Sequence, residues 1–95
     1  MSELLPHSQV DAELAQLGGW SRDADTVVHD ESHKDFGAAL ERLNAIARLA
    51  EEADHHPDLL LHSWNKLQVR LSTHSAGGIT AADIKLARSI DGLGR

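Results

Sequence analysis

The chain has 95 residues, 41% of them hydrophobic and 25% charged, which is typical of one globular domain over residues 1–95 with loose ends at 1–7 and 92–95. It contains no cysteine, which excludes disulfides, thiolate metal sites and cysteine nucleophiles, and its net charge of -6 argues against nucleic acid as a partner. No apolar segment is long enough to cross a bilayer and the first residues lack the pattern of a secretory signal, so we expect a cytoplasmic protein without a membrane partner.

The first third of the chain predicts one helix and one hairpin. Apolar residues at helical spacing follow Ser8, the expected N-cap, and Gly18 is the expected end of this helix. Segments 20–23 and 26–31 flank a two-residue turn and predict two antiparallel strands. The stretch 29–33 is almost entirely polar, so we expect the second strand to be short, frayed or facing solvent.

The longest helix is predicted over residues 34–54, where apolar residues repeat on one face at helical spacing. Pro57 disfavours helical angles in the residue before it, so the helix must end nearby. His56 is therefore the expected boundary residue, and His55 is expected in the last helical turn.

The remaining third predicts a second hairpin and a last helix. The apolar run 59–63 and the alternating run 67–74 predict two antiparallel strands, the second of which ends at His74. Thr80 and Asp83 have the spacing of a capping box and are expected to open the last helix. The order α-β-β-α-β-β-α predicts an α+β fold in which three helices pack against a four-stranded antiparallel sheet.

Two adjacent histidines, His55 and His56, stand at the predicted end of the long helix. Glu51 precedes His55 by four positions and Glu52 precedes His56 by four, so each acid is expected to orient one ring. A helix C-terminus favours a protonated imidazole, whereas a neighbouring like charge disfavours it. We therefore expect the two rings to hold different protonation states near neutral pH, as a site with one acid and one base requires.

A third histidine, His74, is expected to project from the face of its strand opposite the buried residues, where it is free to reach a cleft. A zinc site is an alternative for three imidazoles, but adjacent side chains on a helix diverge by about 100°, which disfavours one ion shared by neighbours. The other histidines have no spacing partner and are interpreted as solvated: His7, His29, His33 and His62. Trp20 and Trp64 are interpreted as core or hairpin anchors.

These residues match a known signature. The run E-E-A-D-H-H-P at 51–57, followed by Trp64, L-S-T-H at 71–74 and Asp83, resembles the motif of the pterin-4a-carbinolamine dehydratases in residue type and in spacing. The resemblance extends from the first predicted helix to about residue 91.

The resemblance implies an enzyme that eliminates water from a 4a-hydroxy-tetrahydropterin to give the quinonoid dihydropterin, a step of pterin recycling. It implies His55, His56 and His74 as the catalytic histidines, with His55 and His74 transferring protons and His56 binding or orienting the pterin. The supporting or substrate-binding residues that it implies are Glu51, Asp83, Ser72, Thr73 and Trp64. Members of this family need no metal or organic cofactor, have their helices on one side of the sheet, and form homodimers or homotetramers.

Two departures from the family pattern bear on these expectations. Six residues separate Pro57 from Trp64 where many relatives have five, which could bulge the strand between them. The polar stretch 29–33 stands where relatives have alternating large apolar residues, which weakens the case for a subunit contact there. A protein-interaction or dimerisation module with weak catalysis therefore stays open as the alternative function.

Overall fold

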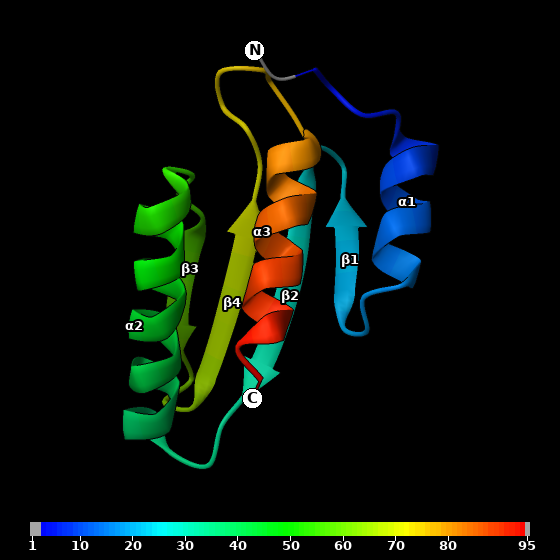
Figure 1. The fold of residues 1–95 in the computed structure, drawn as a ribbon. Helices are drawn as coiled ribbons and strands as arrows, with labels where there is room; N and C mark the ends of the chain where they lie inside the picture. Colours follow the sequence, from blue (N-terminus) through cyan, green and yellow to red (C-terminus); the bar gives the residue numbers. More distant parts are fainter. Residues whose placement is uncertain (1–2, 95) are drawn as a thin grey trace.

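The structure, a computed structural model, describes residues 3–94 as seven elements around one core (Figure 1). The helices are α1 (His7–Ala15), α2 (Phe36–Ala53) and α3 (Ala81–Gly92). The strands are β1 (Trp20–Asp23), β2 (Thr26–Ser32), β3 (Asp58–His62) and β4 (Lys66–Leu71). This is the predicted order of elements, and no helix within the described range is long and apolar enough to cross a membrane.

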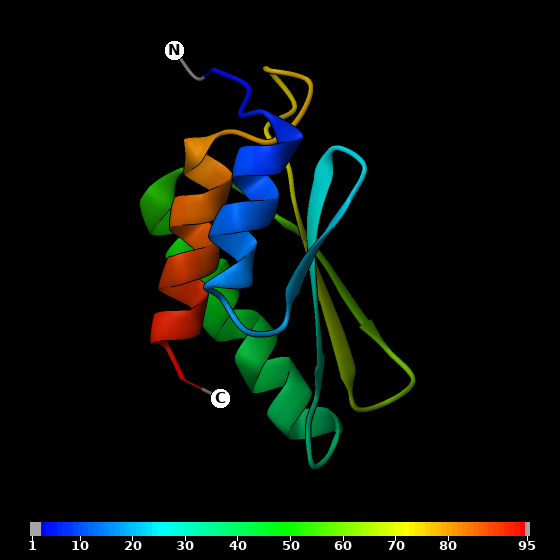
Figure 2. The same cartoon turned by 90° about the vertical axis from the view of Figure 1, so that its right-hand side faces the viewer.

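The four strands form one antiparallel sheet in the order β1-β2-β4-β3. All three helices lie against the same face of this sheet, as Figure 2 shows, so the predicted α+β fold is confirmed. Because side chains alternate between the two faces of a strand, every second residue of β4 points toward the helices. These inward residues, Leu67, Val69 and Leu71, are fully buried in the core between sheet and helices.

Helix α2 positions the histidine pair through the way it ends. The last helical residue is Ala53, and Asp54 takes a left-handed conformation with φ of 50°. This turn lets the N–H of His55 donate to the carbonyl of Ala50 at 3.1 Å, a common way of closing a helix. The prediction of His55 in the last turn was therefore wrong, because the left-handed residue ends the helix before Pro57 does.

The other two helices begin at caps of different kinds. Helix α1 starts at His7 directly after Pro6, so the prediction of Ser8 as N-cap was wrong. A proline suits a helix start because its φ is already helical and its missing N–H has no partner to lose there. The capping box of α3 is confirmed, since the N–H of Thr80 donates to the carboxylate of Asp83 at 2.9 Å.

Strand β2 is a full strand of seven residues between β1 and β4, so the prediction of a short or solvent-facing strand was wrong. Its inward side chains include His29, which is 1% exposed, and Glu31, which is 7% exposed. Arg42 of α2 donates to the Glu31 carboxylate in three contacts of 3.0, 3.1 and 3.2 Å. The strand can therefore be polar and still be buried, because its charge is paired inside the protein.

Two histidines complete this buried charge cluster, which consists of His29, Glu31, His33 and Arg42. His29 Nε2 lies 2.8 Å from one oxygen of Glu31, and His33 Nε2 lies 2.8 Å from the other. The interpretation of these two histidines as solvated was therefore wrong. His29 Nδ1 lies 2.7 Å from the carbonyl of Gly19, so each nitrogen of this ring faces an oxygen atom.

The pKa of Glu31 follows from this arrangement. Burial raises the pKa of the carboxyl group, but the hydrogen bonds from His29, Arg42 and His33 outweigh burial and lower the pKa from 4.5 to about 2. The carboxylate is therefore ionised at neutral pH, where it balances the guanidinium charge of Arg42.

The hairpin of β3 and β4 brings the second histidine segment to the site. The two strands pair residue for residue from Asp58 to His62, so the predicted bulge was wrong. Ser63 and Trp64 adopt positive φ values of 47° and 56° in the turn between the strands. Strand β4 ends at Leu71, so His74 lies in the following loop and not, as predicted, at the end of the strand.

Where the two ends of the chain are described, they are attached to the fold. The N–H of Leu5 donates to the carbonyl of Ile79 at 2.9 Å, and the carbonyl of Gly94 accepts from the arginine of the buried charge cluster. Residues 1–2 and 95, which we also expected to be loose, lie outside the described residues.

Candidate active site

Segments that are distant in the sequence meet at one end of the molecule, the upper end in Figure 1. They are the segment after α2, the loop after β4 and the start of α3. Between the first two lies an open cleft of about 260 Å³, lined by Asp54, His55, His56, Ser72, Thr73, His74 and Ser75. The fold therefore brings the three predicted histidines to one cleft.

His55 is held by a buried carboxylate. Its Nε2 lies 2.5 Å from Oδ1 of Asp83, which is completely buried at the start of α3. The second oxygen of Asp83 accepts from the hydroxyl of Thr73 and from the N–H of Thr80, both at 2.9 Å. This carboxylate is thus fixed by the helix cap and in turn fixes the ring. The expected partner of His55 was Glu51, and that pairing was wrong.

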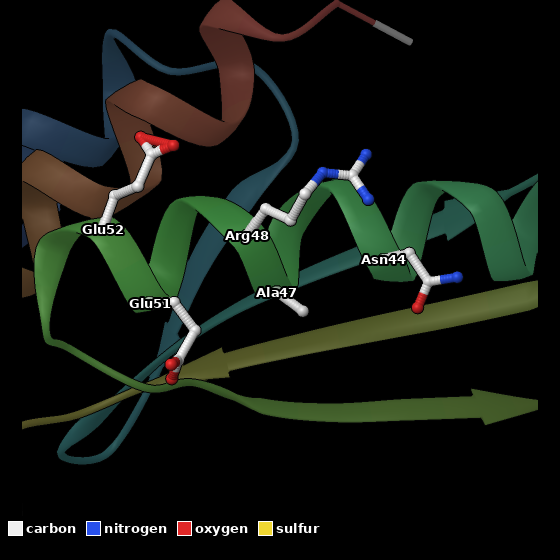
Figure 3. A pocket seen from close by; sticks show the side chains of 5 residues that line it. All are labelled: Asn44, Ala47, Arg48, Glu51 and Glu52. Carbon is white, nitrogen blue, oxygen red and sulfur yellow. The ribbon is translucent and has the colours of Figure 1, made fainter.

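His56 pairs with Glu51 instead. The distance from His56 Nε2 to Glu51 Oε1 is 2.5 Å, and both side chains are exposed. Because α2 ends earlier than predicted, the chain turns between Glu51 and the histidines, and the pairing moves by one residue. Glu52, the expected partner of His56, projects from a different side of the helix from Glu51 in Figure 3.

The hydrogen bonds determine which ring nitrogens remain for a ligand. In His55 and His56 the Nε2 atom is bound to a carboxylate, so Nδ1 is the remaining nitrogen of each ring. The ring of His74 is exposed and makes no hydrogen bond or ion pair with another residue of the range 3–94. Within the same range, no three histidine, cysteine or acidic side chains are grouped so that they could hold a metal ion.

The other predicted site residues lie in different places. Ser72 is half-buried and lines the cleft, whereas the buried hydroxyl of Thr73 bonds with the side chains that cap α3. Trp64 is 62% exposed in the β3–β4 turn, at the far end of that hairpin from the histidines. The structure does not bring Trp64 to the cleft. The alternative interpretation of Trp64, as a hairpin residue, agrees with its position in the turn. Trp20 is a buried core residue, as that interpretation also allowed.

Two residues of the cleft lining were not predicted from the sequence. Asp54 and Ser75 each directly follow or precede a predicted histidine, and both face the cleft. A signal for Asp54 was available. Aspartate is one of the few residues with a side chain that tolerate a left-handed conformation, and Pro57 indicates that the helix ends close by. No comparable signal distinguishes Ser75 from other loop serines.

A larger hollow, of about 430 Å³, lies along the surface of α2 (Figure 3). Its lining consists of side chains of this one helix: Asn44, Ala47, Arg48, Glu51 and Glu52. Of these five residues, Glu51 alone is bonded to a histidine of the cleft. The smaller cleft therefore holds the groups that can transfer protons, and it is the candidate active site.

Comparison with known proteins identifies the family. The sequence profile of the family described as pterin 4 alpha carbinolamine dehydratase matches residues 3–93. The chain belongs to this family. The resemblance inferred from the histidine motifs is thereby confirmed, and it spans almost the whole chain.

Relatives of similar length support the same assignment. A protein of Aquifex aeolicus is 46% identical over 93 residues, which cover 98% of this chain and 93% of the relative. A protein of Thermosynechococcus vestitus is 42% identical over 93 residues, covering 98% and 97%. Both carry the name "Putative pterin-4-alpha-carbinolamine dehydratase". A crystal structure from Brucella melitensis, described as a transcriptional coactivator/pterin dehydratase, superposes with a TM-score of 0.87 at 32% identity, covering 96% of this chain and 98% of the other.

Proposed function

We propose that this member of the pterin-4a-carbinolamine dehydratase family eliminates water from 4a-hydroxy-tetrahydropterins to give the quinonoid dihydropterin. The observation that carries the proposal is the cleft in which His55, His56 and His74 meet. The reaction breaks the bond between C4a and the hydroxyl oxygen, and the oxygen leaves as water after it takes up a proton. The adjacent ring nitrogen N5 loses its proton, and its electron pair forms the double bond to C4a.

In the proposed mechanism His55 is the base. Its Nε2 hydrogen is bound to the buried carboxylate of Asp83, so its Nδ1 can accept the proton from N5. A carboxylate in this position holds the tautomer and stabilises the imidazolium that forms, as in other histidine–aspartate pairs.

His74 is the acid in this mechanism. Its ring is exposed and is bound to no carboxylate of residues 3–94, so it can give a proton to the leaving hydroxyl and regain one from water. His56, held by Glu51 at the rim, orients the pterin. Both proton transfers are within the capacity of imidazoles, so we propose no metal or organic cofactor, the pterin being the substrate.

The test is the dehydration rate of chemically generated 4a-hydroxy-tetrahydropterin. We expect His55→Ala and His74→Ala each to lose about a hundredfold or more in kcat, as removal of a general acid or base typically does. His62→Ala is the matched control, because the His62 ring is exposed and, within residues 3–94, its one hydrogen-bond partner is the hydroxyl of Ser63. If the wild-type protein does not exceed the spontaneous rate, the proposal is wrong.

A second candidate function is an interaction or dimerisation module, which the description of the Brucella relative as a coactivator favours. This function would be favoured if the folded wild-type protein left the spontaneous rate of pterin dehydration unchanged.

For either function we propose, from the family, a cytoplasmic homodimer or homotetramer without nucleic-acid or membrane partners. A monomer in light scattering would contradict that state.

A further inference from the structure

A buried hydroxyl group lies behind the pair of His55 and Asp83. It belongs to Thr80, the N-cap residue of α3, which is not among the residues that line the histidine cleft. Its hydroxyl oxygen lies 2.8 Å from that of Thr73, which is also buried. An effect of the Thr80 hydroxyl on a substrate in the cleft must therefore pass through other side chains.

The direction of the hydrogen bonds in this group follows from the number of hydrogens. A hydroxyl has one hydrogen to donate, and Thr73 donates its own to Oδ2 of Asp83 at 2.9 Å. In the contact between the two hydroxyls the donor must then be Thr80. The Thr80 oxygen accepts in turn from the N–H of Ala82 at 3.3 Å. The bonds run in one direction, from the backbone of α3 through two hydroxyls to the carboxylate.

We call the hydroxyls of Thr80 and Thr73 the hydroxyl relay. The backbone fixes both residues, since the N–H of Thr73 donates to the carbonyl of Gly78 at 2.7 Å and Thr80 forms a β-bridge with Leu4. In a chain of hydrogen bonds each bond polarises the next, so a hydroxyl that accepts a bond becomes a better donor. The bond from Thr80 therefore strengthens the bond that Thr73 makes to Asp83.

Resting on the proposed dehydration, we propose that Thr80 is a positioning residue of the candidate site, which acts on His55 through the hydroxyl relay and the buried carboxylate. The relay holds Oδ2 of Asp83, so that Oδ1 stays aimed at Nε2 of His55. This arrangement keeps the ring hydrogen on Nε2 and leaves Nδ1 free to accept the proton of the substrate.

The first test is the dehydration rate of two variants at Thr80. Thr80→Val removes the hydroxyl and keeps the shape of the side chain, whereas Thr80→Ser keeps the hydroxyl. Because only part of one bond's effect passes to the next, we expect Thr80→Val to lower kcat about two- to fivefold with KM unchanged. Thr80→Ser should retain the wild-type kcat. An unchanged kcat in Thr80→Val, or an equal loss in both variants, would overturn the proposal.

The second test asks whether Thr80 acts through Thr73. Thr73→Val removes a hydrogen bond to a charged acceptor, so we expect kcat to fall about tenfold. Adding Thr80→Val to this variant should lower kcat no further, because the relay is already interrupted at Thr73. If the effects of the two changes multiply, the two hydroxyls act independently and there is no relay.

Thr80→Val also removes a helix cap, so its effect on folding needs a matched control. Asp35 caps α2 by accepting from the N–H of Ala38 at 2.8 Å, and the start of α2 lies at the opposite end of the molecule from the cleft (Figure 1). Asp35→Ala should lower the midpoint of thermal unfolding by a similar amount and leave kcat unchanged. An equal fall in kcat in both cap variants would mean that lost stability is the cause. If Thr80→Val does not fold, Thr80→Ala takes its place.

A measurement that needs no activity keeps the two proposals separate. The ¹⁵N shifts of the His55 ring, measured by NMR at a pH where the ring is neutral, report which nitrogen carries the hydrogen. We expect the Nε2–H tautomer alone in wild type and Thr80→Ser, and a share of the other tautomer that increases from Thr80→Val to Thr73→Val. If wild type shows these shifts without dehydrating the pterin, the dehydratase proposal fails and the relay stands. Identical ring shifts in all four proteins would overturn the relay, even in an active enzyme.

Discussion

Asp83 is the residue on which the fold and the candidate site both depend. One of its oxygens accepts from the cap of α3 and the other holds His55. Burying an ionised carboxylate is costly unless it is fully hydrogen-bonded, and here three donors supply that compensation. The buried carboxylate is thus already fixed in position, and it holds His55 at the cleft before any substrate is present.

An isosteric change at this residue tests its effect on His55. In Asp83→Asn the amide oxygen can still accept from Thr80, but an N–H then faces Nε2 of His55 and imposes the wrong tautomer. We expect kcat to fall by about a hundredfold to ten-thousandfold, the upper value being that of an equivalent change in a serine protease triad. Thermal unfolding measured in parallel should change little. A fall in kcat that merely tracks a loss of folded protein would contradict this role.

Glu31 gives the fold a defined dependence on acid. Its pKa of about 2 in the folded protein lies below the ordinary value of 4.5, so its ionised form is stabilised by folding. This contribution, roughly 3 kcal/mol, is fully present above about pH 4.5 and is lost as the pH falls toward 2. Urea unfolding between pH 7 and pH 2.5 measures it.

The variant Glu31→Gln isolates this contribution from those of the other carboxyl groups. It leaves Arg42 and His29 without a carboxylate, so we expect a loss of about 3 to 5 kcal/mol at pH 7 and a flatter response to acid. Glu41→Gln, a change at an exposed position of α2, is the control. Parallel acid curves for wild type and Glu31→Gln would show that the group contributes nothing specific.

Among the elements, α2 determines the site through its C-terminus. Asp54 adopts the left-handed conformation there, which costs a residue with a side chain about 1 kcal/mol and costs glycine nothing. This turn, more than Pro57, sends the two histidines toward different acids.

Two variants that both remove the Asp54 side chain test the turn itself. We expect Asp54→Gly to unfold with a free energy about 1 kcal/mol higher than Asp54→Ala, because only glycine adopts this φ without strain. Urea unfolding of the pair gives the difference directly. Equal stabilities would mean that the left-handed turn is not what ends the helix.

At the scale of the whole molecule, the sequence predicted those features of the fold that depend on residues close together in the chain. The order of elements and the capping box at Thr80 follow from spacing, whereas the three histidines of one site were implied by the family resemblance. What failed depends on partners remote in sequence. Strand β2 was misread because the residue that neutralises Glu31 lies on another element, at Arg42. The partner of His55 was misassigned because Asp83 reaches it only through the packing of α3.

The double use of Asp83 has a consequence for the evolution of this family. A gene copy that kept the fold but no longer needed the reaction would still be under selection to retain an acceptor oxygen at this position, since the cap of α3 depends on it. His74 has no such second role, because its exposed ring is bonded to nothing else in the described part of the chain. Among descendants of such a protein, the loss of His74 would mark those that have left catalysis, while an intact Asp83 would be uninformative.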